Sequence, residues 1–563
     1  MGGMITSALF LGTIFAAVTP GTDGVFAKEP PAIREAIDRE SGIVHPGVGF
    51  SKTQLETIVR NVRGGVEPWK RLYGELSARD NRFSKHPRIF TDRRVPDPGI
   101  GSPEFDNRCE WDSETAVGQS LMYLITGEEC YRSNALEIVR WFSRNVKRGW
   151  PHWDSQFRWP YAEHWYIAAA ELLRYTGPVT GPLAWTDEDT RQVDRFIKIG
   201  ENMWWGRGML CNQLQWALGG PLARAVWRND RALYDESVEI LTANRMGPVG
   251  QCNGSIKEMC RLVVSNEVTG AAVTPHVQFS EMGRDIGHPF PGAGALAENL
   301  AILMSQGTKV DPVTGETSKK KNAVEPIEYL DHRFLRGVNQ ICKYNLGFDI
   351  DWTPIYINRG KNELWPCPSN WGGGRGRIVD TMDLLYNYYR WKRGAKLERG
   401  EDARYLGYAN RLRGWNACRA FFWMPAEAAG KWRDERIDPG RGNTIHFAEL
   451  IQPKGRPNPK DYIVPVFLPF RHPLPKPGEY TLRYRTDGEA RLAVIDPQDY
   501  ATEFEDGVAA TKRKYVEIVK LPSTNGKWSD FTFKLEKPPR RNLIKLRFAT
   551  RGEFIEIETL KGF

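Results

Sequence analysis

The apolar residues between positions 111 and 420 recur at intervals of three and four, and this spacing predicts a long series of amphipathic helices. The predicted helices span 116–125, 133–146, 161–175, 187–203, 211–226, 231–243, 293–306, 331–345, 380–393 and 402–420. Gly219-Gly220-Pro221 should interrupt the helix at 211–226, because proline cannot donate a helical hydrogen bond. Short connections such as 126–129 are typical of antiparallel helix pairs.

Repeated antiparallel pairs of this kind build either a solenoid or a closed toroid. The chain shows no sequence repeat of fixed period, which argues against a regular solenoid. Ahead of the series, Ser51 is predicted to cap a helix that begins at Lys52. Short apolar segments within 250–274 are predicted to be strands or loops that cross the mouth of a toroid.

From about residue 449 the pattern changes to short β-type runs separated by Pro, Gly and Asn. These runs are 463–467, 478–484, 490–495, 515–520, 528–533, 543–549 and 554–559, and they predict a β-sandwich of the jelly-roll type. We therefore expect a mainly α protein, with an incomplete (α/α) toroid or barrel at 28–448 and a β-sandwich module at 449–563. The module shows no cluster of exposed Trp, so we expect it to brace the helices rather than to bind sugar.

The first residues are typical of a secretory signal peptide. The apolar run at 5–18 is too short to span a bilayer, and Val25-Phe26-Ala27 fits a small-x-small cleavage site. We therefore expect a signal peptide at 1–27 and export to the periplasm or the cell exterior. No later run is long and apolar enough to cross a membrane, so the mature chain should be soluble and not inserted in a membrane.

The chain has 563 residues, enough for two or three domains, and its formal net charge of +9 favours an anionic partner. Nucleic acid is not expected, because the chain has no Lys/Arg run with interleaved aromatics and no zinc-finger spacing. An anionic polysaccharide is the better candidate. Twenty Trp and twenty Tyr supply aromatic surface of the kind on which sugar rings stack.

Cysteine and histidine are scattered along the chain. Because there is no CxxC, HxH or HExxH spacing, we expect no catalytic or structural metal and no cofactor. In an oxidising compartment, Cys109 could pair with Cys130, and Cys252 with Cys260. The glycine-rich run at 372–376 lacks the Lys-Ser/Thr of a phosphate-binding loop.

A stretch at 279–289 concentrates ionisable side chains. Glu281, Arg284 and His288 are spaced i, i+3 and i+7, so in a helix they would share about one quarter of the circumference. Asp285 would lie one turn beyond Glu281. Such a face is either a solvated surface with ion pairs or the floor of a site. The run that follows predicts a buried helix, and this favours a site inside the fold.

Other candidates are weaker when taken alone. Asn212 and Gln213 begin a predicted helix, where an Asn most often serves as a cap. An aromatic segment offers Trp159 and Tyr166 as possible sugar contacts, although some residues at this spacing belong to the core. Tyr386 begins a tyrosine-rich run whose spacing is usually a sign of packing.

The residues from Glu281 to His288 read Glu-Met-Gly-Arg-Asp-Ile-Gly-His and precede a Gly/Ala-rich helix. This order resembles the Glu-Ser-Gly-Arg-Asp-Gln-x-His signature of the alginate-lyase-like (α/α) toroid polysaccharide lyases, and polysaccharide lyase family 38 in particular. The resemblance continues at 335–347 and at 386–389, where the family usually has Tyr-Asn-His-Tyr. It covers roughly residues 110–420 and does not reach the C-terminal module.

The resemblance implies β-elimination at a uronic acid of a polysaccharide such as alginate or glucuronan. Arg284 and Asn212 would neutralise the uronate carboxylate, because the C5 proton becomes acidic only when the developing charge is held by fixed donors. His288 would be the base or a carboxylate contact.

The remaining roles follow from the same resemblance. The acid at the leaving oxygen would be a tyrosine, with Tyr344, Tyr356 and Tyr386 as the candidates. Glu281 and Asp285 would orient Arg284 and His288. Further substrate contacts are expected from Trp159, Tyr166, Gln213 and Tyr356.

Two other functions fit the residues. A glycoside hydrolase on the same toroid would need a pair of carboxylates, with Glu281, Asp285 and Asp380 as the candidates. A non-catalytic glycan-binding protein is favoured by three departures from the family pattern, at Met282, Ile286 and Tyr388. A lyase product absorbs ultraviolet light and a hydrolase product does not, so the product separates the two enzymes.

Overall fold

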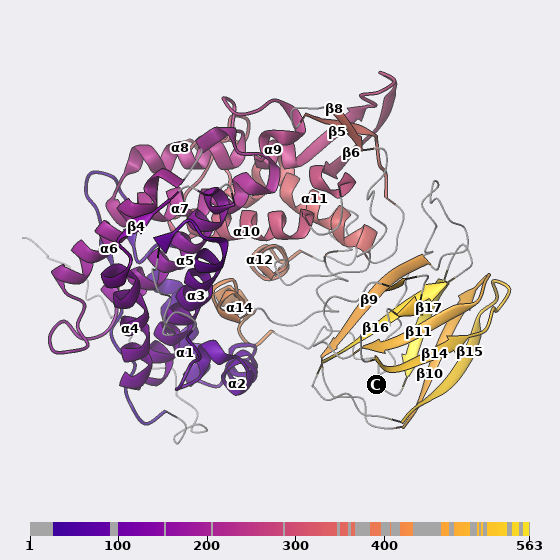
Figure 1. Ribbon diagram of the computed structural model, residues 1–563, viewed down its shortest axis with the longest axis horizontal. Helices are drawn as coiled ribbons and strands as arrows, with labels where there is room; N and C mark the ends of the chain where they lie inside the picture. The colour runs from indigo at the N-terminus through magenta and orange to yellow at the C-terminus, as the bar shows by residue number, and fades with distance from the viewer. Residues whose placement is uncertain are drawn as a thin grey trace, which may run out of the picture.

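The computed structural model shows a helical region and a separate set of C-terminal strands (Figure 1). The described residues are 26–89, 99–150, 152, 154–203, 206–284, 288–345, 350–358, 362–365, 383–395, 406, 417–431, 463–471, 478–495, 504–505, 508–509, 515–536, 543–550 and 555–561. Residues 1–25 of the predicted signal peptide lie outside them. So do Asp285, Asp380 and most of the predicted helix at 402–420.

The protein is mainly helical, as predicted. The helices are α1 (Lys52–Arg63), α2 (Trp69–Arg79), α3 (Pro103–Thr126), α4 (Glu129–Asn145), α5 (Ser155–Tyr175), α6 (Asp187–Gly200), α7 (Cys211–Arg228), α8 (Arg231–Thr242), α9 (Ile256–Met259), α10 (Pro289–Ser305), α11 (Tyr329–Asn345), α12 (Asp383–Asn387) and α14 (Ala417–Phe422). Short turns are η1 (Asn81–Phe83), η2 (Glu201–Met203), η3 (Gly206–Gly208), η4 (Gly250–Asn253), η5 (Ser280–Gly283), η6 (Pro326–Glu328), η8 (Tyr388–Lys392) and η10 (Ala426–Ala428).

Local sequence explains where these helices begin and end. Ser51 caps α1 in a capping box with Gln54, which confirms the predicted start. Ser102 caps α3, and Gly127 ends it in the left-handed conformation that glycine adopts at no steric cost. The turn predicted at 126–129 is therefore confirmed.

The predicted break in α7 is wrong, because the helix runs through Gly219, Gly220 and Pro221. Both glycines serve packing. A Cβ at Gly219 would lie 3.2 Å from the Cβ of His164, and one at Gly220 would lie 2.7 Å from Oε2 of Glu163. The glycines thus allow α5 to approach α7 closely, while Pro221 costs one backbone hydrogen bond without ending the helix.

Helices α3, α5, α7 and α10 form a row by packing against one another in that order, and neighbours run parallel. Asn107 of α3 meets Arg158 of α5, while Phe157 and Arg174 of α5 meet Trp216 and Trp227 of α7. Later residues of α10 meet later residues of α7. Gly292 faces Asn212, and Asn299 donates to the carbonyl of Gln215 at 2.8 Å. Parallel neighbours place their first turns at the same end of the row. Helices α4, α6 and α8 pack as the intervening antiparallel partners.

The segment before α1 is fastened to the opposite end of this row. It carries the short strands β1 (Ala36–Ile37) and β2 (Val44–His45). The Nδ1 atom of His45 lies 3.1 Å from the Glu171 carboxylate on α5, and its Nε2 atom lies 2.8 Å from Oδ1 of Asn229. His45 therefore joins three segments that are distant in sequence.

Two hairpins cover the end where the first turns lie. They are formed by β5 (Cys260–Ser265) with β6 (Ala272–Phe279), and by β7 (Ile355–Asn358) with β8 (Asn362–Trp365); the first confirms the strands expected near 250–274. The two-residue strands β3 (Gly99–Ile100) and β4 (Arg148–Gly149) pair in parallel. Helix α11 packs against β6, and the buried Gln278 of β6 exchanges two hydrogen bonds with the backbone of Thr353.

The C-terminal strands match the predicted ones closely. They are β9 (Ile463–Arg471), β10 (Gly478–Thr486), β11 (Ala490–Ile495), β12 (Phe504–Glu505), β13 (Val508–Ala509), β14 (Tyr515–Leu521), β15 (Ser529–Leu535), β16 (Leu543–Thr550) and β17 (Ile555–Lys561). They form antiparallel sheets in the orders β15-β10-β17 and β14-β11-β16-β9, with β12 paired to β13. The packing of the two larger sheets into a jelly-roll sandwich stays a prediction, as does the domain boundary at 449.

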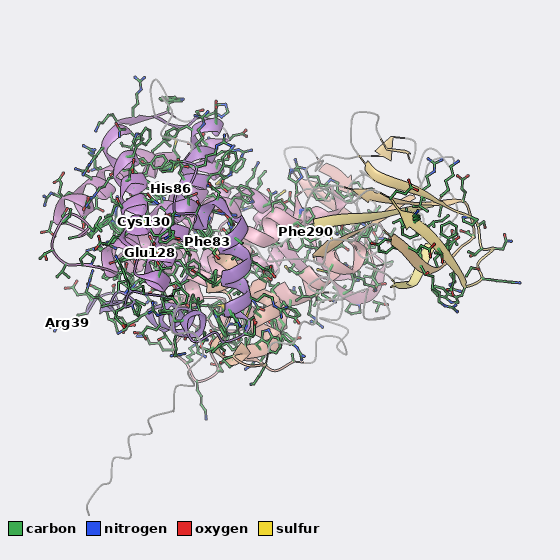
Figure 2. All side chains as sticks on the ribbon, turned by 90° about the horizontal axis from the view of Figure 1, so that it is seen from below. Arg39, Phe83, His86, Glu128, Cys130 and Phe290 are labelled. Atoms are coloured by element: carbon green, nitrogen blue, oxygen red, sulfur yellow. The ribbon has the colours of Figure 1, made fainter. Side chains whose placement is uncertain are left out.

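The predicted disulfides do not form. Cys109, Cys130 and Cys260 carry thiols that are not bonded to another cysteine, so neither Cys109–Cys130 nor Cys252–Cys260 exists. Cys130 is exposed at the start of α4, beside Glu128 (Figure 2). None of the helices among the described residues combines the length and the apolarity needed to cross a membrane.

Candidate functional site

The centre of the candidate site is the turn η5, which follows directly after β6. The backbone N–H of Phe279 donates to Oε1 of Gln340 on α11 at 3.1 Å, and the hydroxyl of Ser280 contacts the sulfur of Met259 at 3.1 Å. A Cβ at Gly283 would lie 2.6 Å from the Cβ of Trp365, so the Trp packs directly on the turn. These contacts fix the backbone on both sides of Glu281.

Glu281 joins the turn to the start of α7. Its side chain is fully buried, and its Oε2 atom accepts a hydrogen bond from the backbone N–H of Asn212 at 3.1 Å. Its Oε1 atom lies 3.5 Å from Nη1 of Arg284. The carboxylate thus satisfies a donor at a helix N-terminus, where negative charge is favoured, and holds the guanidinium from behind.

The structure corrects the expected role of Asn212 as a helix cap. The cap position of α7 is occupied by Leu210, which makes no side-chain capping bond, and Cys211 has a left-handed φ of 49°. Asn212 lies inside the first turn, where its backbone is capped by Glu281. Its side chain is therefore not needed to cap its own helix.

The first turn of α10 completes the arrangement. His288 occupies the cap position of α10 and is half-buried, and its carbonyl accepts from the N–H of Gly292 at 3.1 Å. A Cβ at Gly292 would lie 2.9 Å from the Cβ of Asn212. Two helix N-termini therefore meet at Asn212, with Arg284 and His288 on the segment that leads into the second.

The stretch at 279–289 is not a regular α-helix where the structure describes it. Among the described residues between Phe279 and His288, the helical turn is Ser280–Gly283, and it is of the 3-10 type. Glu281 and Arg284 nevertheless meet, because residues three positions apart lie one above the other in a 3-10 turn. Asp285 lies outside the described residues.

The three candidate tyrosines differ in exposure. Tyr356 on β7 is exposed, whereas Tyr344 on α11 and Tyr386 on α12 are buried. Tyr344 follows Gln340 by one helical turn, so it lies on the face of α11 that meets the backbone before η5. Gln213 is half-buried beside Asn212, and its N–H donates to the carbonyl of Leu210.

Trp159 and Tyr166 are not placed to contact a sugar. Both are fully buried, and the ring of Phe196 on α6 packs against each of them, at centroid distances of 5.3 Å and 4.6 Å. The Tyr166 hydroxyl donates to the carbonyl of Val139 on α4 at 3.1 Å. Both side chains therefore fill the core between the helical layers rather than joining the site.

Sequence reasoning missed a buried charge cluster around Arg419 of α14. Its Nη2 atom lies 2.8 Å from Oε1 of Glu114 and 3.0 Å from the Tyr161 hydroxyl, and its Nε atom lies 2.6 Å from Oε1 of Glu298. The guanidinium also lies 4.5 Å from the ring centre of Trp165. One side chain thus connects α3, α5 and α10 to α14.

Burial and neighbouring charges together set the charge states in this cluster. Burial alone would raise the pKa of Glu114, but Arg419 and Arg82 outweigh it and leave the pKa below its ordinary value. Burial lowers the pKa of His164 to about 3, so this imidazole is neutral. Glu110, one turn before Glu114 on α3, has its pKa raised to about 8 by burial and by the charge of Glu114. A signal for the cluster exists in the sequence, since Arg419 and Glu298 each interrupt an otherwise apolar run.

No family model matches the chain, and no curated protein matches it. Among solved structures, the chain is similar to an alginate lyase, A1-III, complexed with tetrasaccharide, at 15% sequence identity and a TM-score of 0.32. The similarity covers 57% of this chain and 84% of that one. A likeness of this size establishes neither a common fold nor a common activity, so the function is inferred from the geometry of the site.

Proposed function

We propose that this protein is a polysaccharide lyase that cleaves a uronic-acid polysaccharide, such as alginate or glucuronan, by β-elimination. The observation that carries the proposal is the buried Glu281 carboxylate, which connects the first turn of α7 to the guanidinium of Arg284. We further propose that the helices form an incomplete (α/α) toroid, and that a signal peptide at 1–27 directs export to the periplasm or the cell exterior, where such a polymer is met.

Arg284 is suited to neutralise a uronate carboxylate. Its side chain is 31% exposed although its partner Glu281 is fully buried, so a fixed cation reaches the surface here. A guanidinium held in this way can present two parallel N–H groups to a planar carboxylate. Asn212 would add a neutral donor, and the N-termini of α7 and α10 would stabilise the negative charge that develops on the enolate.

Proton transfer is assigned to His288 and a tyrosine. His288 is half-buried at the cap of α10, next to the proposed carboxylate site, and an imidazole can remove the C5 proton near neutral pH. Tyr344 is our choice for the acid at the leaving oxygen, because its helix face meets the backbone that leads into η5. Tyr356 and Tyr386 are the alternatives.

The geometry gives less support to a hydrolase. That reaction needs two carboxyl groups that can exchange a proton with water or with the leaving oxygen. Both oxygens of Glu281 are engaged, one by a backbone N–H and one by Arg284. The other two candidate carboxylates, Asp285 and Asp380, lie outside the described residues.

The test is ultraviolet absorbance of the unsaturated product during incubation with alginate, glucuronan and glycosaminoglycans. We expect a rise with the wild-type protein that Arg284→Ala and His288→Ala each reduce by at least about 100-fold, the scale of losing one stabilising donor or base. Arg228→Ala, on α7 but paired with Glu201 at the far end, is the control and should retain activity. New reducing ends without absorbance would contradict elimination and favour hydrolysis.

A further inference from the structure

Arg158 on α5 is a half-buried cation whose charge acts on Asp106 and Glu110 of α3, where it opposes the burial that raises the pKa of each carboxyl. Its Nη1 atom donates to Oδ1 of Asn107 on α3 at 3.0 Å, and its guanidinium lies 5.6 Å from the ring centre of Phe157. Its Nε atom is buried and makes no hydrogen bond. Among the residues that the structure describes, no carboxylate lies within ion-pair distance of it, although most of the other buried arginines have one. A buried donor without an acceptor costs stability, so a carboxylate that reached this guanidinium would gain a charge-assisted hydrogen bond.

Trp216 on α7 packs against Phe157, the residue before Arg158, and lies one turn after Asn212. It follows Asn212 by four residues, so the two side chains share one helix face and are one turn apart. Its ring lies 6.3 Å from that of Phe157 and 4.7 Å from that of Tyr161, measured between centres. The indole remains partly exposed, although two rings and a helix surround it.

Trp216 is held firmly from behind. The hydroxyl of Tyr161, whose ring packs on the indole, donates to Oε1 of Glu298 at 3.1 Å and accepts from Arg419 at 3.0 Å. A partly exposed aromatic ring on such a rigid base is suited to stack on the apolar face of a pyranose, because little side-chain entropy is lost on binding.

The spacing fits a chain of sugars. One helical turn advances about 5.4 Å along the axis, which is comparable to the length of one pyranose unit. A uronate whose carboxylate is held at Arg284 and Asn212 would therefore place its neighbour over Trp216. The carboxylate of that neighbour would need a cation, and Arg158 lies on the next helix of the row.

We propose that Arg158 and Trp216 form a second subsite, which binds the neighbouring carboxylate-bearing sugar of the same polysaccharide chain. Arg158 pairs with its carboxylate, Trp216 stacks on its ring, and Asn107 orients the guanidinium. This inference rests on the proposed function, because it takes the site at Asn212 as the place where the first uronate binds.

The experiment compares binding and turnover of tetrasaccharides prepared from alginate and from glucuronan. Arg158→Gln should raise both Kd and KM about tenfold, the effect of losing one charged contact, and leave kcat within about twofold. Arg158→Lys should recover part of the loss. Trp216→Ala should raise KM to a similar degree and Trp216→Phe much less. Arg174→Gln is the matched control, since Arg174 is also half-buried on α5 but stacks on Tyr175 and Trp227 at the other end.

The outcomes separate this inference from the lyase proposal. If the wild-type protein cleaves a tetrasaccharide and Arg158→Gln leaves Kd and KM unchanged, the subsite is wrong and the lyase proposal stands. If the protein binds a tetrasaccharide without forming unsaturated product, and Arg158→Gln still weakens binding tenfold, the subsite stands and the lyase proposal fails. If the wild-type protein neither binds nor cleaves either tetrasaccharide, both are overturned.

Discussion

At the scale of single residues, the site depends on contacts made by very small groups. Gly292 has no side chain, and the space where its Cβ would lie is taken by Asn212. Gly283 has the same relation to Trp365. Glu281 reaches across to α7 because nothing bulkier than hydrogen intervenes at these positions. The two glycines therefore allow the close packing that positions the site, and the polar residues beside them would carry out the proposed reaction.

We predict that Gly292→Ala reduces kcat/KM by about 10- to 100-fold, because the new methyl group must displace Asn212 by several tenths of an ångström or more. The thermal unfolding midpoint should fall by only a few degrees, since one methyl group is accommodated at a helix start. The measurement is steady-state kinetics alongside a melting curve. Gly307→Ala controls for a loss of stability alone, because Gly307 has a left-handed φ and a Cβ there would meet nothing within 4 Å. An unchanged kcat/KM in Gly292→Ala would show that Asn212 need not be held in place.

Glu110 makes binding sensitive to alkaline pH. The groups that act on it are Glu114, Glu298, Arg419 and Arg158, and its pKa is raised to about 8 by burial first and by Glu114 second. Below that pH the carboxyl is protonated and neutral, and above it the carboxylate repels an anionic sugar near Arg158. We predict that KM for a polyuronate rises above pH 8 in the wild-type protein and that this rise is smaller in Glu110→Gln. Identical pH profiles of KM for the two proteins would contradict the prediction.

The sequence named candidate site residues but did not predict the contacts that position them. The i, i+3 spacing brought Glu281 and Arg284 together, and they do form an ion pair, whereas the contact between Glu281 and Asn212 could not be read from the spacing. Periodicity describes neighbours along one element, whereas Glu281 and Asn212 are 69 positions apart and meet through a backbone N–H. For the same reason Trp159 and Tyr166 were misassigned, because an aromatic run does not show which helix packs upon it.

At the scale of elements, sequence-based prediction succeeded where neighbouring residues alone determine the start or end of a helix or strand. The cap at Ser51, the turn after α3 and the C-terminal strands follow from residues within one turn or one strand. It failed at Pro221, because the packing of α5 on α7 outweighs the local preference for a break. Longer-range fastening, such as that of β2 onto α5, leaves no local signal at all.

The His45–Glu171 pair should make this fastening depend on pH. Burial alone would lower the pKa of His45, but the hydrogen bond and the charge of Glu171 outweigh it, so the pKa lies above its ordinary value of 6.5. The pair therefore stabilises the fold fully below pH 6.5 and loses its effect as pH rises through the higher folded-state pKa.

We predict that the difference in melting temperature between wild type and His45→Gln is larger at pH 6 than at pH 9. Glutamine keeps a polar side chain there but cannot be protonated. The check is thermal unfolding by circular dichroism in buffers of equal ionic strength, with His276→Gln on the exposed β6 segment as the control. A difference that stays constant between the two pH values would mean that His45 is neutral in the folded protein.

At the scale of the whole molecule, Arg419 is the contact that connects the ends of the helical row. It contacts α3, α5 and α10 from a short helix that comes more than a hundred residues after α10 in sequence. Removing it would leave Glu114 and Glu298 buried without their main cation, and an uncompensated buried charge is costly. The cluster was not foreseen, because its members come from four separate helices.

We predict that Arg419→Met destabilises the protein by about 3–5 kcal/mol, the usual cost of breaking a buried ion pair from one side. Chemical denaturation followed by tryptophan fluorescence measures this cost. Arg228→Met breaks a pair with Glu201 that is exposed at both ends, and it should change stability by less than about 1 kcal/mol. Equal effects of the two substitutions would show that the cluster does not hold the helices together.

Because the helices of the row run parallel, residues with the same proposed role lie at a similar distance from the helix N-termini. First turns carry Asn212 and the approach of Arg284 and His288, second turns carry Arg158 and Trp216, and the Arg419 cluster lies deeper still. A mutant library confined to the opening turns of α5, α7 and α10 would therefore sample new sugar preferences while leaving the stabilising layer untouched. Within those opening turns the positions to vary are Arg158 and Trp216, because Asn212, His288 and Gly292 serve the proposed reaction and the Arg419 cluster holds the helices together.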